Sequence, residues 1–84
     1  MSENKSVISI NDYGRIKINL NELIEKRGIK RNTLAKAVNT RFEVIDKWCK
    51  NKVEKLDMDI LARICFVLDC EISDIIEYEE KRWT

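Results

Sequence analysis

The sequence predicts a small, mainly α-helical domain that carries a β-hairpin at its N-terminus. Its 84 residues include no proline and only two glycines, so few positions force the chain to break. Apolar residues recur at helical spacing after about residue 20, whereas two short runs before it alternate between apolar and polar side chains. Hydrophobic residues make up 44% and charged residues 37% of the chain, a balance that suits one compact globule.

The N-terminal hairpin is predicted from the runs VISI (7–10) and RIKIN (15–19), which flank the segment NDYG. Asparagine, aspartate and glycine tolerate the backbone angles of a tight turn, so this segment is a candidate for the connection. An isolated two-stranded hairpin is only marginally stable in water. We therefore expect it to pack on the helices or on a second chain.

The first two helices are predicted from their boundaries as well as from their apolar faces. Asn19 precedes Glu22 by three residues, the spacing of a capping box, and Gly28 is placed to end the first helix in the left-handed conformation. This helix is expected at about 20–27. The second is expected at about 31–38, followed by a turn at Asn39, because asparagine accepts a positive φ at low cost.

Three further helices are expected in the second half of the chain. One begins near Arg41, with Thr40 or Arg41 as its cap, and buries Ile45 and Trp48 together with Val44 or Cys49. The next contains about a dozen residues, and Asp57 can cap it or complement its N-terminal dipole. Its apolar face is formed by Leu56, Ile60, Leu61, Ile64, Cys65 and Leu68. A closing helix is expected in ISDIIEY, with Ser73 as its cap and core contacts from Ile72, Ile75 and Ile76.

Charge is distributed unevenly along a chain whose net charge is only +1. Residues 26–55 contain ten basic and three acidic side chains, a net charge of +7. Residues 56–84 contain three basic and eight acidic side chains, a net charge of −5, and the first 25 residues have a net charge of −1. A basic segment of this kind indicates a polyanionic partner.

Several classes of protein are disfavoured by the residues that the sequence lacks. There is no histidine for general base chemistry or zinc binding, no glycine-rich phosphate loop and no CxxC pair, so we expect neither an enzyme nor a metal or other cofactor. The three cysteines are interpreted as reduced thiols, with Cys65 as a core filler and the roles of Cys49 and Cys70 open. No apolar run approaches the ~20 residues of a membrane span, and MSENKSVISI lacks the features of a signal peptide, so a cytoplasmic location is expected.

The segment from Arg31 to Lys50 contains two short helices joined by a tight polar turn, the composition typical of a helix-turn-helix. The sequence from LNELIEKRGIKRNTLAKAV to LARICFVLDCEISDII resembles the lambda-repressor/Cro-like (XRE-type) helix-turn-helix domains, in particular their small stand-alone members. This resemblance covers roughly residues 18–80. It implies five helices, of which the second crosses the phosphate backbone and the third lies in the major groove.

The resemblance also implies roles for particular side chains. Base contacts are expected from Arg41, Phe42, Glu43 and Lys47, and phosphate contacts from Lys30, Arg31, Lys36, Lys50 and Lys52. Asn39 stands where the family usually has glycine, Lys30 where it has a small capping residue, and Trp48 where it has an aliphatic side chain. Glu43 can accept a hydrogen bond from cytosine N4. Asp46 is expected to be held by Lys50 at i,i+4 or to turn to solvent.

Two functions of different classes follow. The first is sequence-specific binding of double-stranded DNA by a small transcriptional regulator, acting as a homodimer through the hairpin or the C-terminal segment YEEKRWT. The alternative is a protein-binding module, antitoxin-like or a co-regulator, that keeps the fold without reading DNA. No small-molecule ligand is implied. The expected organisation is a hairpin extension at 1–18, a helix-turn-helix domain at 19–80 and a tail at 81–84.

Overall fold

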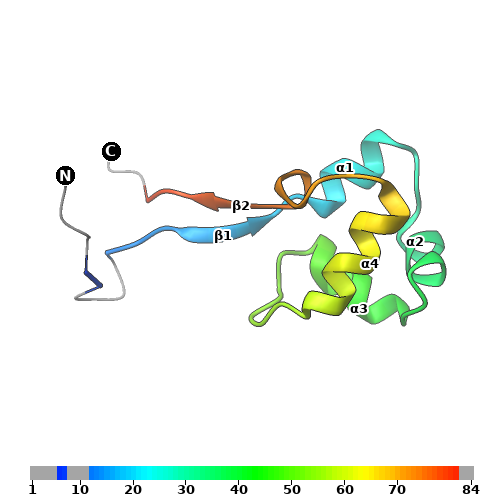
Figure 1. Ribbon diagram of the computed structural model, residues 1–84, viewed down its shortest axis with the longest axis horizontal. Helices are drawn as coiled ribbons and strands as arrows, with labels where there is room; N and C mark the ends of the chain where they lie inside the picture. The colour runs from blue at the N-terminus through cyan, green and yellow to red at the C-terminus, as the bar shows by residue number, and fades with distance from the viewer. Residues whose placement is uncertain (1–5, 8–11, 82–84) are drawn as a thin grey trace.

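The computed structural model describes residues 6–7 and 12–81, a body of four α-helices with a two-stranded arm (Figure 1). The helices are α1 (Leu20–Lys26), α2 (Arg31–Ala37), α3 (Phe42–Cys49) and α4 (Met58–Leu68). The arm consists of β1 (Arg15–Ile18) and β2 (Ile76–Glu79), and a 3-10 helix, η1 (Ile72–Asp74), connects α4 to β2. The arm projects from one side of the helical body (Figure 1).

The pairing of β1 differs from the predicted N-terminal hairpin. β1 pairs antiparallel with β2, from the far end of the chain, with Ile16 opposite Tyr78 and Ile18 opposite Ile76. The first strand of the predicted hairpin, residues 7–10, lies largely outside the described residues. Ile18 is only 3% exposed and Ile76 packs against the core, so burial at the base of the arm favours this long-range pairing.

The prediction of a fifth, closing helix is wrong. Residues 72–74 form η1 and residues 76–79 form β2, which leaves four α-helices among the described residues. Glu71, not Ser73, precedes the first residue of η1, and its backbone N–H donates to the Asp74 carboxylate (2.9 Å). Ile75 is fully buried, but Ile72 is 54% exposed and is not a core residue. Pairing with β1 provides hydrogen-bond partners for the backbone of residues 76–79. These residues therefore form a strand, although the spacing of their apolar side chains suits a helix.

The turn and cap predictions have mixed outcomes. Gly28 and Asn39 adopt positive φ values of 69° and 59°, as predicted. Asp57 caps α4 by accepting the backbone N–H groups of Asp59 and Ile60, which confirms its role. Asn19 precedes α1, but its side chain makes no cap hydrogen bond, so the predicted capping box is wrong. Its backbone N–H instead donates to the Ile75 carbonyl (2.6 Å), which ties the start of α1 to the end of η1.

The helices share one hydrophobic core. The side chains that are almost completely buried are Leu20, Ile24, Leu34, Val38, Ile45, Ile64 and Ile75. Trp48 and Cys49 belong to the same core, and Val44 is partly buried against it. Val44 and Cys49 were predicted as alternatives, and both contact the core. Leu56 precedes α4 and is largely exposed, which is a correction to the predicted face of that helix. Among the described residues, no helix has the length and hydrophobicity to cross a membrane.

Asn51 connects the loop after α3 to the arm. Its side-chain amide brackets Ile18, accepting from the backbone N–H (2.7 Å) and donating to the carbonyl (2.8 Å). The residue itself has a positive φ of 60°, which asparagine tolerates better than most side chains. Asn51 therefore bonds both backbone groups of Ile18, as a neighbouring strand would, and holds the base of the arm against the helical body.

Replacing Asn51 tests this connection. We expect Asn51→Ala to lower the free energy of unfolding by about 2 kcal/mol. The substitution removes the hydrogen-bond partner of the Ile18 backbone N–H and carbonyl, and it keeps the positive φ at residue 51. Asn51→Gly loses the same hydrogen bonds but relieves the angle, so it should cost about 1 kcal/mol less than alanine. Denaturant unfolding of both variants measures the two effects. Equal stabilities for the wild type and the alanine variant would show that the two Asn51–Ile18 hydrogen bonds contribute nothing to stability.

Candidate nucleic-acid interface

The helix-turn-helix unit consists of α2, a short turn and α3, which pack directly against each other. The end of α2 is closed by two backbone hydrogen bonds, from Asn39 N–H to the Lys36 carbonyl (3.1 Å) and from Thr40 N–H to the Ala35 carbonyl (2.9 Å). This arrangement needs a left-handed residue, and Asn39 supplies it in place of glycine. Arg41 then precedes α3 in an extended conformation, so the direction of α3 is set within four residues of the end of α2.

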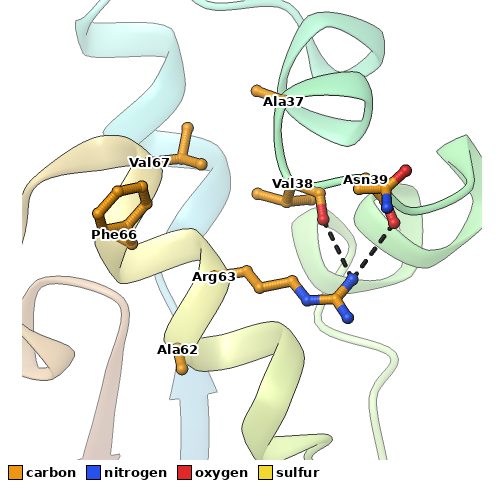
Figure 2. Close-up of a pocket in the computed structure, with 7 residues that line it drawn as sticks. All are labelled: Ala37, Val38, Asn39, Ala62, Arg63, Phe66 and Val67. Atoms are coloured by element: carbon orange, nitrogen blue, oxygen red, sulfur yellow. Dashed lines mark hydrogen bonds between the residues drawn. The ribbon is translucent and has the colours of Figure 1, made fainter.

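Arg63 of α4 holds this turn from the other side. Its Nη1 atom donates to the carbonyls of Val38 and Asn39, each at 3.3 Å, and its Nη2 atom lies 2.7 Å from the Asp59 carboxylate. Figure 2 shows the guanidinium reaching across a surface pocket toward the end of α2. The sequence pattern does not single out Arg63, because an arginine on a helix four residues after an aspartate resembles an ordinary solvent-exposed pair.

The two faces of α3 divide as the sequence predicts. Ile45 and Trp48 are buried in the core. The four side chains expected to contact bases are all at the surface: Arg41, Phe42 and Glu43 at the start of the helix, and Lys47 in its last turn. Phe42 is 43% exposed, although it is apolar. None of the three charged side chains in this group forms a hydrogen bond or ion pair within the described residues, so all three are available to a ligand.

Asp46 lies between two cations, and this explains the carboxylate that a nucleic-acid surface should disfavour. Its carboxylate is 2.6 Å from Arg31 Nη1 and 2.9 Å from Lys50 Nζ, which confirms the predicted Lys50 contact. Arg31 also donates through Nη2 to the Asn21 side chain (3.0 Å). The network joins α1, the first residue of α2 and the middle of α3, and sequence spacing predicts this role for neither Arg31 nor Asn21.

The electrostatics of this network favour the ionised carboxylate. The hydrogen bond from Lys50, then that from Arg31, and the charges of the same two residues hold the pKa of Asp46 below its ordinary value of 3.8, against a smaller opposing effect of burial. Asp46 is therefore fully charged at neutral pH. Because its charge is matched by two neighbouring cations, Glu43 is the remaining acidic side chain of α3 that presents an uncompensated charge at the surface.

The residues expected at phosphate fall into two groups. Lys30, Lys36 and Lys52 are exposed and make no ion pair within the described part of the chain. Arg31 and Lys50 are bound to Asp46, and the Arg31 side chain is only 30% exposed. After α3, a surface hollow is lined by Trp48, by three lysines and by two acidic residues: Lys47, Lys52, Lys55, Glu54 and Asp57. The sequence pattern indicates only a solvated face for Lys55, since no helical spacing relates it to α3.

The thiol of α3 is not a reactive site. Cys49 is buried, and burial raises the pKa of its thiol, so the nucleophilic thiolate is disfavoured at neutral pH. In residues 6–7 and 12–81, no three potential ligands among histidine, cysteine, aspartate and glutamate cluster as a metal site would require. The chemistry of this surface is that of charged and apolar contacts.

Titration of Asp46 tests the network. The carboxyl carbon should titrate by NMR with a midpoint below 3.8, and Lys50→Ala and Arg31→Ala should each raise that midpoint toward the ordinary value. Because folding lowers this pKa, the stability that it contributes is present above about pH 4 and is lost as the pH falls through the folded-state midpoint. An Asp46 midpoint that neither variant moves would refute the assignment.

The comparison with known proteins agrees with this geometry. A search of curated proteins finds no significant match. The family model of the Cro/C1-type HTH DNA-binding domain matches residues 19–81, which includes all four helices and β2. That match covers most of the chain and contains the α2–turn–α3 unit. The chain therefore belongs to the Cro/C1-type helix-turn-helix DNA-binding domain family.

Proposed function

We propose that this protein is a small transcriptional regulator that binds double-stranded DNA sequence-specifically, with α3 in the major groove. The observation that carries the proposal is the exposed start of α3. There, the unpaired Arg41 and Glu43 flank the exposed ring of Phe42, and the unpaired Lys47 follows one turn later, on a helix whose opposite face is anchored in the core. A rigid helix with free polar groups at its N-terminal end suits direct reading of base edges.

Each of these side chains has a distinct chemistry toward a base pair. Arg41 and Lys47 can donate to guanine O6 and N7, whereas Glu43 can accept from cytosine N4. Phe42, nearly half exposed, can contact a thymine methyl group. Glu43 is repelled by phosphate, so its position favours a helix that enters the groove with its first turn rather than one that lies along the backbone.

The proposed backbone contacts are made by lysines on both sides of α3. Lys30, Lys36 and Lys52 are unpaired in the described structure and can neutralise phosphates directly. Arg31 and Lys50 remain proposed phosphate contacts through the donors that Asp46 does not use, and Arg31 in addition positions α3. Contacts of this kind fix the orientation of the domain on DNA but carry no base preference.

We also propose that the protein acts as a homodimer through the arm. A helix of eight residues reads few base pairs, and two copies would place their α3 helices in successive major grooves about 34 Å apart. Ile16 and Tyr78 are directly opposite each other on the ladder and are 57% and 56% exposed. Exposed apolar pairs on a two-stranded arm are suited to burial against a second arm. The sheet crosses the expected boundary after residue 18, so β1 is proposed to fold with the domain.

The alternative function, a protein-binding module without DNA readout, makes the opposite prediction for the basic surface. In that case the lysines would be a solvated face and the chain would have no measurable affinity for any duplex at low salt. The same binding experiments therefore discriminate the two classes.

Variants of α3 and of the following loop should affect DNA binding differently. Glu43→Ala or Lys47→Ala should change the preference at one base pair by about 1–3 kcal/mol in a selection from a random duplex pool. Lys52→Ala should weaken binding to all sequences alike and reduce the slope of log K against log salt by about one. An unchanged preference in both α3 variants would refute the assignment of that surface.

Lys26→Ala is the matched control for Lys52→Ala. Both remove one exposed lysine, but Lys26 ends α1, outside the α2–turn–α3 unit and the loop that follows it. The control should leave the salt slope unchanged. Equal losses for the two lysines would indicate a diffuse charge effect rather than a contact in the loop after α3.

The dimer is tested with two exposed apolar residues. Ile16→Glu should convert a sedimenting dimer to a monomer, because it places carboxylates in the apolar arm contact. Phe66→Glu, on α4 at 86% exposure, is the control and should leave the dimer intact. Both positions are exposed, so neither substitution should unfold the domain. A monomeric wild type would refute the dimer, and loss of the dimer only in the Phe66 variant would place the contact on α4.

A further inference from the structure

The junction between α4 and η1 brings two cysteines together. Cys70 is five residues after Cys65, and its backbone N–H donates to the Cys65 carbonyl (3.2 Å), while Asp69 N–H donates to the Phe66 carbonyl (3.4 Å). Asp69 between them has φ 49° and ψ 57°, the left-handed conformation. These features define a Schellman motif, in which the side chains at the positions of Cys65 and Cys70 are in contact across the end of the helix.

The two thiols interact directly. The pKa of the Cys70 thiol is raised, first by burial and then by its neighbour Cys65. Both thiols are free and only partly buried, at the edge of the core. In most proteins an apolar pair fills these positions, so the contact itself is ordinary. Two thiols at the same positions add a chemistry that an apolar pair lacks.

We propose that Cys65 and Cys70 form a reversible intramolecular disulfide that locks the end of α4 to the segment leading into β2. A disulfide requires Cα atoms that are close together and Cβ atoms that face each other, and the closed turn of a Schellman motif brings the two residues together across the helix end. Cys49 lies in the core on α3 and takes no part. The site is independent of DNA binding and is a modification site beyond the proposed function.

The oxidant in this reaction is a small-molecule disulfide such as oxidised glutathione. One cysteine thiolate attacks a sulfur of the reagent, breaking its S–S bond, forming a mixed disulfide and releasing the first reagent thiol. The second cysteine then attacks the protein sulfur of the mixed disulfide, closing the Cys65–Cys70 bond and releasing the second reagent thiol. Two electrons pass from the cysteine pair to the reagent, and the two cysteine protons end on its thiols.

The bond would act on the connection between body and arm. Residues 70–75 lead directly from α4 to β2, and Ile75 anchors them in the core. On the α4 side, Arg27 donates to the Leu68 carbonyl, so the same helix end also contacts the end of α1. A covalent bond at this junction restricts the unfolded chain and the fraying of the helix end, and it should stabilise the oxidised protein.

The test is equilibration of the full chain in glutathione redox buffers, followed by alkylation, intact mass measurement and peptide mapping. We expect oxidation to remove two hydrogen atoms, leave one alkylatable thiol at Cys49 and link the Cys65 and Cys70 peptides in a monomeric chain. The oxidised protein should also unfold at a higher temperature than the reduced one. Retention of three free thiols, stable glutathione adducts, or links that involve Cys49 or a second chain would each overturn the proposal.

Serine variants test the disulfide with little risk of unfolding the protein. Cys65→Ser and Cys70→Ser change one atom at partly exposed positions, and each should abolish the intramolecular bond and the redox dependence of thermal unfolding. Cys49→Ala should retain both. If Cys49→Ala fails to fold, the peptide map of the oxidised wild type still identifies the linked pair.

Discussion

The structure depends most on how the carboxylate of Asp46 is placed between Arg31 and Lys50. This contact joins the first residue of α2 to the middle of α3, and through Arg31 it extends to Asn21 on α1. Surface ion pairs contribute little singly, but a carboxylate shared by two cations and held by an amide is a network with a defined geometry. It fixes the relative placement of the two helices and prevents an acidic side chain from facing a polyanion unmatched.

Hydrogen bonds from side chains to the backbone fix the path of the turns, which the hydrophobic core does not specify. The core residues hold the helices together, but apolar contacts are not directional and do not specify the path of a turn. Arg63 binds the two carbonyls at the end of α2, and Asn51 binds both backbone groups of Ile18. Within the described part of the chain, three non-glycine residues have a positive φ and lie where the chain reverses: Asn39, Asn51 and Asp69. All three are residue types that tolerate this conformation.

The arrangement of charge in space explains the unequal distribution along the chain. The basic segment forms α2, α3 and the following loop, whereas β2 and the residue after it carry Glu77, Glu79 and Glu80. The arm itself is balanced in charge, because Arg15 and Lys17 of β1 face Glu79 and Glu77 of β2, so the attraction to a polyanion comes from the helical body. The apolar pair on the arm, Ile16 and Tyr78, is exposed and available to another protein surface.

The sequence by itself determined the segments of α1 to α4, the turn at Asn39, the cap at Asp57 and the exposed face of α3, because these follow from local spacing and backbone preference. Only the tertiary structure decided the partner of β1, the strand in place of a closing helix, and the contacts of Arg31, Arg63 and Asn51. Each of these joins residues distant in sequence. Periodicity reports which face of a segment is apolar but not which distant segment will satisfy its backbone and charges.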